Sequence, residues 1–197
     1  MGQVMLPPGP QLASCVDAFL VGAIPDQGAS FELLFPASAR PRLILITKGA
    51  GSMVSPCGVT QALPPAFVAG PKLALRKYVI EPGSEFAMAV LRPGAFTRFF
   101  DRPLNDFSSC ILPLDQLVPA SAAASLLDRL HSARGAGEAA ETLKTFLNTA
   151  RSLMQQRQLF SKRGKIVGIL SDFAREFYDK RLPLEALDIR QRLAEQI

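Results

Sequence analysis

The stretch VLRPGAFTRFF, residues 90–100, decides how the chain is divided between strands and helices. Its apolar start is typical of a strand. Arg-Pro-Gly ends that strand, because proline has no N–H for the ladder and glycine relaxes the backbone. Three aromatic residues then follow i, i+3, i+4 spacing, which places them on one helical face with Arg98 turned away: Phe96, Phe99 and Phe100. The stretch therefore predicts a junction between a half built from strands and a half built from helices.

The residues up to Pro119 have the turn residues that are typical of a β structure, since they include fifteen of the sixteen prolines. Short apolar runs alternate there with Pro/Gly turns, as an antiparallel sandwich or small barrel requires. KGAG (48–51) and EPGS (81–84) are typical of hairpin turns. The run 43–48 is apolar on nearly both faces, so we expect a central strand. The expected fold class is α+β, with an N-terminal antiparallel β-barrel or sandwich followed by a C-terminal helical subdomain.

Helical periodicity replaces this pattern after Pro119. Ser121 is positioned to cap a helix that ends near Leu130. A longer, one-sided helix is predicted over 138–160 and a third over 165–178. The apolar stripe of the long helix either packs within the chain or pairs with its copy in a second subunit. Taken as candidate dimer-interface residues, its members are Leu143, Phe146, Leu147, Leu153 and Met154.

Length and composition bound the class of protein. With 197 residues and 48% hydrophobic side chains, the chain can bury one good-sized core. No apolar run approaches the roughly 20 residues that span a bilayer, and the first residues do not resemble a secretory signal. We therefore expect a cytoplasmic protein with no membrane partner. Cys15, Cys57 and Cys110 lack CxxC spacing, which favours reduced thiols and leaves a redox-active thiol as the alternative.

The net charge of +5 is concentrated towards the C-terminal end. Residues 1–150 carry 12 basic and 11 acidic side chains, whereas residues 151–197 carry 10 and 6. This asymmetry fits a polyanion partner, and a solvated helical face explains it equally well.

The polar residues give no sign of catalysis or of a metal site. His131 is the single histidine, and a mononuclear metal site in a small β-barrel needs two or three imidazoles with a carboxylate. The same shortage argues against Ser-His-Asp and Cys-His catalysis, and neither GxxxxGK[ST] nor GxGxxG occurs. We expect no enzyme, no catalytic residues, no metal and no cofactor.

The order of short motifs over roughly residues 20–180 resembles a known family. A strand ends in Arg-Pro-Gly-Ala (92–95), a short aromatic helix and an Asp-Arg-Pro-Leu turn (101–104) follow, and then comes ILPLDQL (111–117). This order resembles the N-terminal sensory domain of AraC/XylS-type transcriptional regulators. In that group a cupin-like β region closes with a PGA motif, followed by a short helix, a Pro-Leu turn and a VPL-D-x-L segment.

Further pieces of the resemblance lie on both sides of these motifs. FELLF (31–35) and AFVAGP (66–71) look like the family's early strand and its strand leading to a Gly-Pro. Leu91 departs from the pattern, because an aromatic residue is usual before the PGA motif. DIRQRLAEQI (188–197) is similar to the opening helix of the family's first helix-turn-helix. The resemblance implies a regulator truncated within that motif, before any recognition helix.

The resemblance divides the chain into a cupin-like sensory domain (1–119), a helical linker and dimerisation region (120–180) and the start of a helix-turn-helix domain (181–197). It implies a homodimeric AraC family transcription regulator with a ligand-binding domain for an unknown small-molecule effector. DNA-binding would occur only through the missing C-terminal domain, and the ligand would shift the population of the DNA-competent dimer. Two alternatives stay open: a free-standing metal-independent cupin-like small-molecule-binding protein, and a constitutive dimerisation module without a ligand.

A ligand pocket is predicted on the faces of two consecutive strands. Arg76 and Tyr78 share one face of their strand, and a hairpin turn at 81–84 would pair it with the strand that carries Phe86 and Met88. With the aromatic residues of two further strands, the candidate pocket residues are Arg76, Tyr78, Phe86, Met88, Phe35 and Phe67.

The charge of Arg76 constrains this pocket. A guanidinium that faces an apolar interior needs a carboxylate, which Glu32, Glu85 or an acidic ligand could supply. A register shift of one residue would turn the whole set outward and point Leu75 and Lys77 inward instead.

Overall fold

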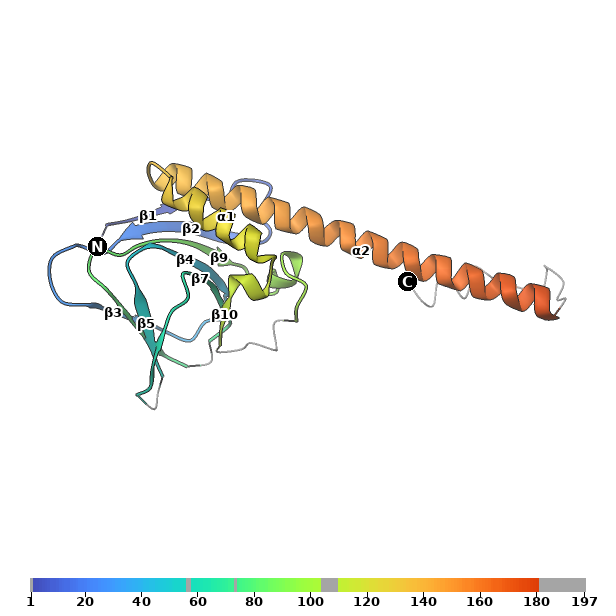
Figure 1. The fold of residues 1–197 in the computed structure, drawn as a ribbon, viewed down its shortest axis with the longest axis horizontal. Helices are drawn as coiled ribbons and strands as arrows, with labels where there is room; N and C mark the ends of the chain where they lie inside the picture. Colours follow the sequence, from blue (N-terminus) through green and yellow to red (C-terminus); the bar gives the residue numbers. More distant parts are fainter. Residues whose placement is uncertain (1, 56–57, 73, 104–109, 181–197) are drawn as a thin grey trace. The chain divides into compact units, whose positions relative to one another are not determined.

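A computed structural model describes residues 2–55, 58–72, 74–103 and 110–180 (Figure 1). The chain divides into two compact units, Met1–Arg151 and Ser152–Ile197. The helix-turn-helix segment predicted over 181–197 lies outside the described residues.

Two antiparallel sheets make up the β part of the first unit. The six-stranded sheet has the order β1 (Gly2–Leu6), β2 (Val16–Ala23), β9 (Glu85–Leu91), β4 (Arg42–Lys48), β7 (Ala66–Ala69) and β10 (Ile111–Pro113). The four-stranded sheet has the order β3 (Phe31–Phe35), β8 (Arg76–Ile80), β5 (Gly51–Val54) and β6 (Thr60–Ala62). The helices of the described residues are the short 3-10 helices η1 (Phe96–Arg98) and η3 (Leu114–Gln116), followed by α1 (Ala120–His131) and α2 (Ala136–Lys180). The α+β fold class is confirmed.

Strand β4 is central, as its two apolar faces predicted, because β9 and β7 flank it. Leu43 and Leu45 are fully buried on one face, in a core shared with both α-helices. Ile44 and Ile46 point to the other face, between the two sheets. One strand therefore contributes to two separate interiors.

The helices cover the outer face of the six-stranded sheet (Figure 1). Leu126 and Leu130 of α1 and Leu143 and Leu147 of α2 are buried in one cluster with residues of β2, β4, β7 and β9. The first compact unit, which ends at Arg151, therefore includes α1 and the first turns of α2, because their leucines are buried on the sheet.

The two expected hairpins are wrong. KGAG joins β4 to β5 and EPGS joins β8 to β9, and in each case the two strands belong to different sheets. Both turns do have the expected glycine geometry, with a φ of 77° at Gly49 and 71° at Gly83. Local turn chemistry predicts a change of direction, whereas the sheet that the next strand joins depends on pairing with strands far away in the sequence. The two turns pack together, since Ser84 Oγ donates a 3.3 Å hydrogen bond to the carbonyl of Ala50.

The helix boundaries also differ from the prediction. Helix α1 begins after Pro119 without a side-chain cap, so Ser121 does not cap it. Helix α2 is one continuous helix and not two over 138–160 and 165–178. A glycine within a helix costs only about 1 kcal/mol, and without a proline the sequence near Gly164 does not stop the helix.

The aromatic residues after Arg-Pro-Gly are buried as their spacing predicted. They are at most 2% exposed and belong to the core that both sheet and helices share: Phe96, Phe99 and Phe100. The junction is not the end of the β part, however, because β10 follows it and pairs with β7. The aromatic segment therefore fills the core and lies in the chain between two strands of one sheet, β9 and β10.

We predict that Phe100→Ala lowers the free energy of unfolding by about 3–5 kcal/mol, the usual cost of removing a buried aromatic ring. Its ring centroid lies 4.9 Å from that of Phe96, so the neighbouring ring also loses its contact. Thr97→Ala in the same segment is the matched control, because Thr97 is exposed and its loss should change stability by less than about 0.5 kcal/mol. Urea unfolding of the three proteins measures the difference. Equal stabilities would contradict a core role for the segment.

Candidate functional site

A cavity of about 370 Å³ lies between the facing sides of the two sheets. The six-stranded sheet contributes apolar side chains from β2, β4, β7 and β9, and the four-stranded sheet contributes side chains from β3 and β8. Most of the wall is aliphatic or aromatic. The charged lining residues are Arg42, Lys72 and Glu85.

Five of the six candidate pocket residues line this cavity: Tyr78, Phe86, Met88, Phe35 and Phe67. The cavity wall does not include Arg76. The predicted hairpin pairing between the strand of Tyr78 and the strand of Phe86 and Met88 is wrong, because these strands, β8 and β9, belong to different sheets that face each other. Leu75 is 57% exposed, and Lys77 makes an ion pair with Glu32 on the outer side of β8. That a ligand binds at these residues stays a prediction.

Lys72 is a site residue that the sequence analysis missed. Only 5% of the residue is exposed. Its Nζ lies 4.2 Å from the ring centroid of Phe35 and 4.8 Å from that of Tyr78. Strand alternation gave no signal, since Lys72 lies outside the strands, in an isolated bridge with Ser38.

Arg42 meets the same phenylalanine ring from the other sheet. Its Cζ lies 5.2 Å from the centroid of Phe35, and among the described residues none accepts a hydrogen bond from its buried Nη1. The sequence could have identified Arg42 as a lining residue, because strand alternation places it on the same face of β4 as Ile44 and Ile46. We call the region of Arg42 and Lys72 the cation end of the cavity.

Burial and mutual repulsion govern the electrostatics of the cation end. Burial, together with the charges of Arg42 and Arg76, lowers the pKa of Lys72 to about 7. Burial also lowers the pKa of Arg42, with the neighbouring Tyr78 opposing that change and Arg40 adding to it. The pKa of the Tyr78 hydroxyl is raised, mainly by burial, so it stays protonated at neutral pH. The cation end therefore holds positive charge in an apolar environment.

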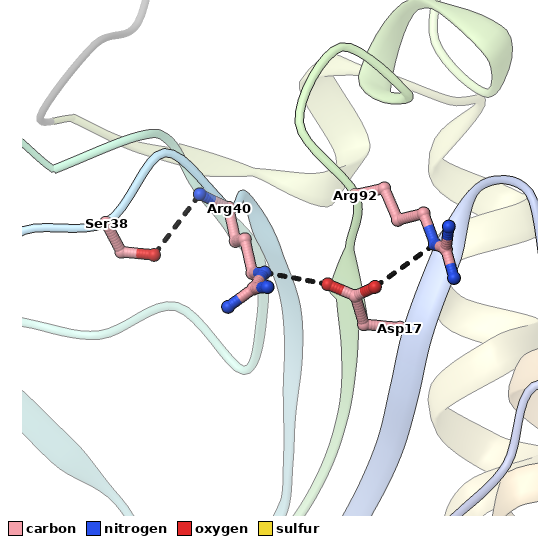
Figure 2. A network of polar contacts seen from close by, with 4 residues as sticks. All are labelled: Asp17, Ser38, Arg40 and Arg92. Carbon is pink, nitrogen blue, oxygen red and sulfur yellow. Dashed lines mark hydrogen bonds and ion pairs between the residues drawn. The ribbon is translucent and has the colours of Figure 1, made fainter.

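The carboxylate at this end of the six-stranded sheet is engaged elsewhere. Asp17 Oδ1 lies 3.1 Å from Arg92 Nε, and Oδ2 lies 2.7 Å from Arg40 Nε, an ion pair without hydrogen-bond geometry (Figure 2). The backbone N–H of Arg40 also donates to Ser38 Oγ at 3.2 Å (Figure 2). These contacts join β2, the segment before β4 and the Arg-Pro-Gly turn, and each Asp17 oxygen lies within ion-pair distance of one of these two arginines.

The candidate dimer residues fall into two groups. Leu143 and Leu147 are fully buried in the core of the first unit, and Phe146 packs against it half-buried. Packing within the chain, the simpler alternative, accounts for these three. Met154 is 8% exposed and Leu153 is 55% exposed, so Leu153 is the member of the set that is open to a second chain.

Across the described ranges, no three His, Cys, Asp or Glu side chains gather closely enough to hold a metal ion. Cys15 is buried and Cys110 is exposed, both as free thiols, and Cys57 lies outside the described residues. The expected lack of metal, cofactor and catalytic residues stays a prediction for the whole chain. None of the described helices is long and apolar enough to cross a membrane.

No protein-family model matches the chain, and no curated protein matches it. Solved structures of ToxT from Vibrio cholerae are similar in fold. A lysine-to-alanine variant of apo ToxT is 14% identical with a TM-score of 0.40, and unsaturated fatty acid bound wild-type ToxT is 15% identical with a TM-score of 0.35. Each match covers 71% of this chain and 56% or 55% of ToxT, so the chain spans little more than half of that protein's length. Likenesses this weak assign neither a family nor a ligand.

We predict that Lys72→Met stabilises the protein at neutral pH. Because the pKa of Lys72 is about 7 in the folded state and 10.5 in the unfolded state, the unfolded chain binds more protons between these values, and stability falls as the pH drops through this window. The variant should be more stable than the wild type by roughly 2 kcal/mol at about pH 7, with a smaller difference at about pH 10.

Urea unfolding over this pH range measures the effect. Lys77→Met is the matched control, because Lys77 is partly exposed and paired with Glu32 on the outer side of the same sheet. It should not gain stability at neutral pH. A Lys72 variant that is less stable than the wild type at neutral pH would show that the ammonium is well accommodated.

Proposed function

We propose that this chain is the effector-sensing part of an AraC-type transcriptional regulator, and that the cavity between its sheets holds a small-molecule effector. The observation that carries the proposal is an apolar cavity whose cations Arg42 and Lys72 are concentrated at one end. Ligand sites commonly combine apolar walls with a few convergent polar groups, and their volumes begin at about 300 Å³. The order of motifs from Arg-Pro-Gly-Ala to ILPLDQL supports the regulator class.

The size of the cavity supports a binding role. Protein interiors are packed as densely as organic crystals, and each unfilled volume costs stability because the lining atoms lose contacts. A cavity of about 370 Å³ in a domain of this size is therefore expensive to keep. An occupant would restore those contacts and offset the cost.

The six-stranded sheet offers a route by which an occupant affects the helices. In β4, Ile44 lines the cavity while its neighbour Leu45 is buried under the helices. The same alternation occurs in β9, where Met88 lines the cavity and Ala89 is buried on the helical side. A ligand that moves these strands would change the surface on which α1 and α2 pack. It could then shift the population of a DNA-competent dimer.

DNA contact belongs, in this proposal, to residues beyond Ile197 that supply the recognition helices. A free-standing small-molecule-binding protein would use the same cavity without those helices, and a constitutive dimerisation module would not use the cavity. The coding sequence after Ile197 separates the first two, because a regulator continues with a Gly-Leu-Ser turn and further Arg-rich helices. The cytoplasm is the compartment that such a regulator requires.

We predict that the neutral apolar dye Nile red binds in the cavity with one molecule per chain. Val90 lines the cavity, so Val90→Phe should reduce the volume and weaken the binding at least about tenfold, a loss of roughly 1.4 kcal/mol. Val79→Phe makes the same change on the outward side of β8, next to Lys77, and should leave the affinity unchanged. A fluorescence titration measures all three proteins. Equal affinity in wild type and Val90→Phe would place the dye outside the cavity and remove the support for an effector site.

We further propose that the regulator is a homodimer that uses the exposed side of α2. Leu153 and Leu159 are 55% and 60% exposed, although an apolar side chain gains free energy from burial. Leu153→Glu should weaken self-association at least about tenfold in light scattering, with the fold retained. Gln156→Glu adds the same charge to the same helix and is the matched control. A Leu153→Glu protein that associates as strongly as the wild type would exclude this surface.

A further inference from the structure

We propose that the cavity is a site for an amphipathic carboxylate, whose carboxylate group lies between Arg42 and Lys72, and that Lys72 takes up a proton from the solvent when this ligand binds. The inference rests on the proposed function and names the chemical class of its ligand. It combines three observations: a buried and a half-buried cation on one ring, the lack of an ion pair between either cation and an acid among the described residues, and an apolar remainder of the cavity.

The geometry of the cation end fits a carboxylate. Lys72 Nζ and Arg42 Cζ lie 4.2 and 5.2 Å from the same ring centroid, that of Phe35. The ring faces attract cations but offer no oxygen that accepts their N–H groups. Among the described residues no oxygen accepts from Arg42 Nη1, and no ion pair involves Arg42 or Lys72. A carboxylate supplies acceptors to both groups at once, because each of its oxygens has two lone pairs.

Among the described residues, three acids of the two sheets lie in other ion pairs or at the far end of the cavity. Asp17 pairs with Arg40 and Arg92, and Glu32 pairs with Lys77 on the outer side of the four-stranded sheet. Glu85 lines the cavity at its far end, because β9 aligns Glu85 with Lys48 and Val90 with Arg42. Glu85 and Val90 are five residues apart on β9, a distance of roughly 16 Å along the strand.

The charges around Lys72 make its protonation depend on the ligand. Arg42 approaches from β4, while Arg76 and Tyr78 approach from β8, and the phenol stays protonated. Burial and the two guanidinium groups lower the pKa of Lys72 to about 7, so much of the amine is neutral above that pH. A carboxylate favours the charged amine and raises its pKa. The ligand should therefore bind most tightly near or below about pH 7 and lose affinity as the pH rises.

The rest of the cavity selects the body of the ligand. Away from the cation end the walls are built from side chains such as Phe67, Phe86 and Met88. A small aromatic or branched aliphatic body fills such a space and contacts both sheets. The anionic group then gives orientation, and the apolar body gives most of the contact area.

Phenylbutyrate and its neutral amide, phenylbutyramide, form a matched pair of probes for isothermal titration. The wild type should bind the acid at least about tenfold more tightly than the amide at about pH 7. Lys72→Met should reduce this preference to less than about threefold while still binding the amide. Lys77→Met, which changes a lysine on the outer side of the sheet, should retain the preference of the wild type.

A second measurement tests the proton. Titrations at about pH 8 in buffers of different ionisation enthalpy should show uptake of up to one proton with phenylbutyrate, and none with the amide or in Lys72→Met. Equal affinities for acid and amide, or binding of Nile red without binding of phenylbutyrate, would overturn this inference and leave the proposed effector site intact. If neither probe nor Nile red binds, both proposals fail.

Discussion

Two cations on the ring of Phe35, the buried Lys72 and the half-buried Arg42, form the constraint on which the site depends. Lys72 and Arg42 reach this ring from different parts of the chain, and a buried charge without a counterion opposes folding. The rest of the sandwich is apolar enough to tolerate that cost, because its core extends from the sheets to both helices. A protein under selection for stability alone would replace either cation with an apolar residue. We interpret the two positive charges as part of a site whose counterion is a bound ligand.

Strand β4 connects this constraint to the rest of the first unit. Arg42, Ile44 and Ile46 line the cavity, whereas Leu43 and Leu45 lie beneath the helices. The Asp17 network fixes the neighbouring end of the sheet, since it ties β2 to both Arg40 and Arg92 (Figure 2). The ion pairs of Asp17 thus connect this end of the sheet to the segment before β4 and to the turn that precedes the aromatic segment. The first unit therefore has two interiors that share a single sheet.

Several parts of the fold could be predicted because short-range patterns determine them. Apolar residues on both faces marked β4 as central, and helical spacing placed Phe96, Phe99 and Phe100 on one face, which is buried. The sheet that a strand joins could not be predicted from a turn, which is why the hairpins at 48–51 and 81–84 were wrong. The aromatic and sulfur-containing lining residues follow from strand alternation. Lys72 does not, because it lies in an irregular segment whose position depends on a bridge to distant Ser38.

The protonation of Lys72 in the ligand-free protein tests the account most directly. An NMR titration of its side-chain Cε resonance, assigned by the signal that Lys72→Met lacks, reports the pKa of this one amine. The account predicts a midpoint near 7, and an upward shift when a carboxylate is bound. A midpoint near the ordinary value of 10.5 in the ligand-free protein would contradict it, because the amine would then be either solvated or already paired.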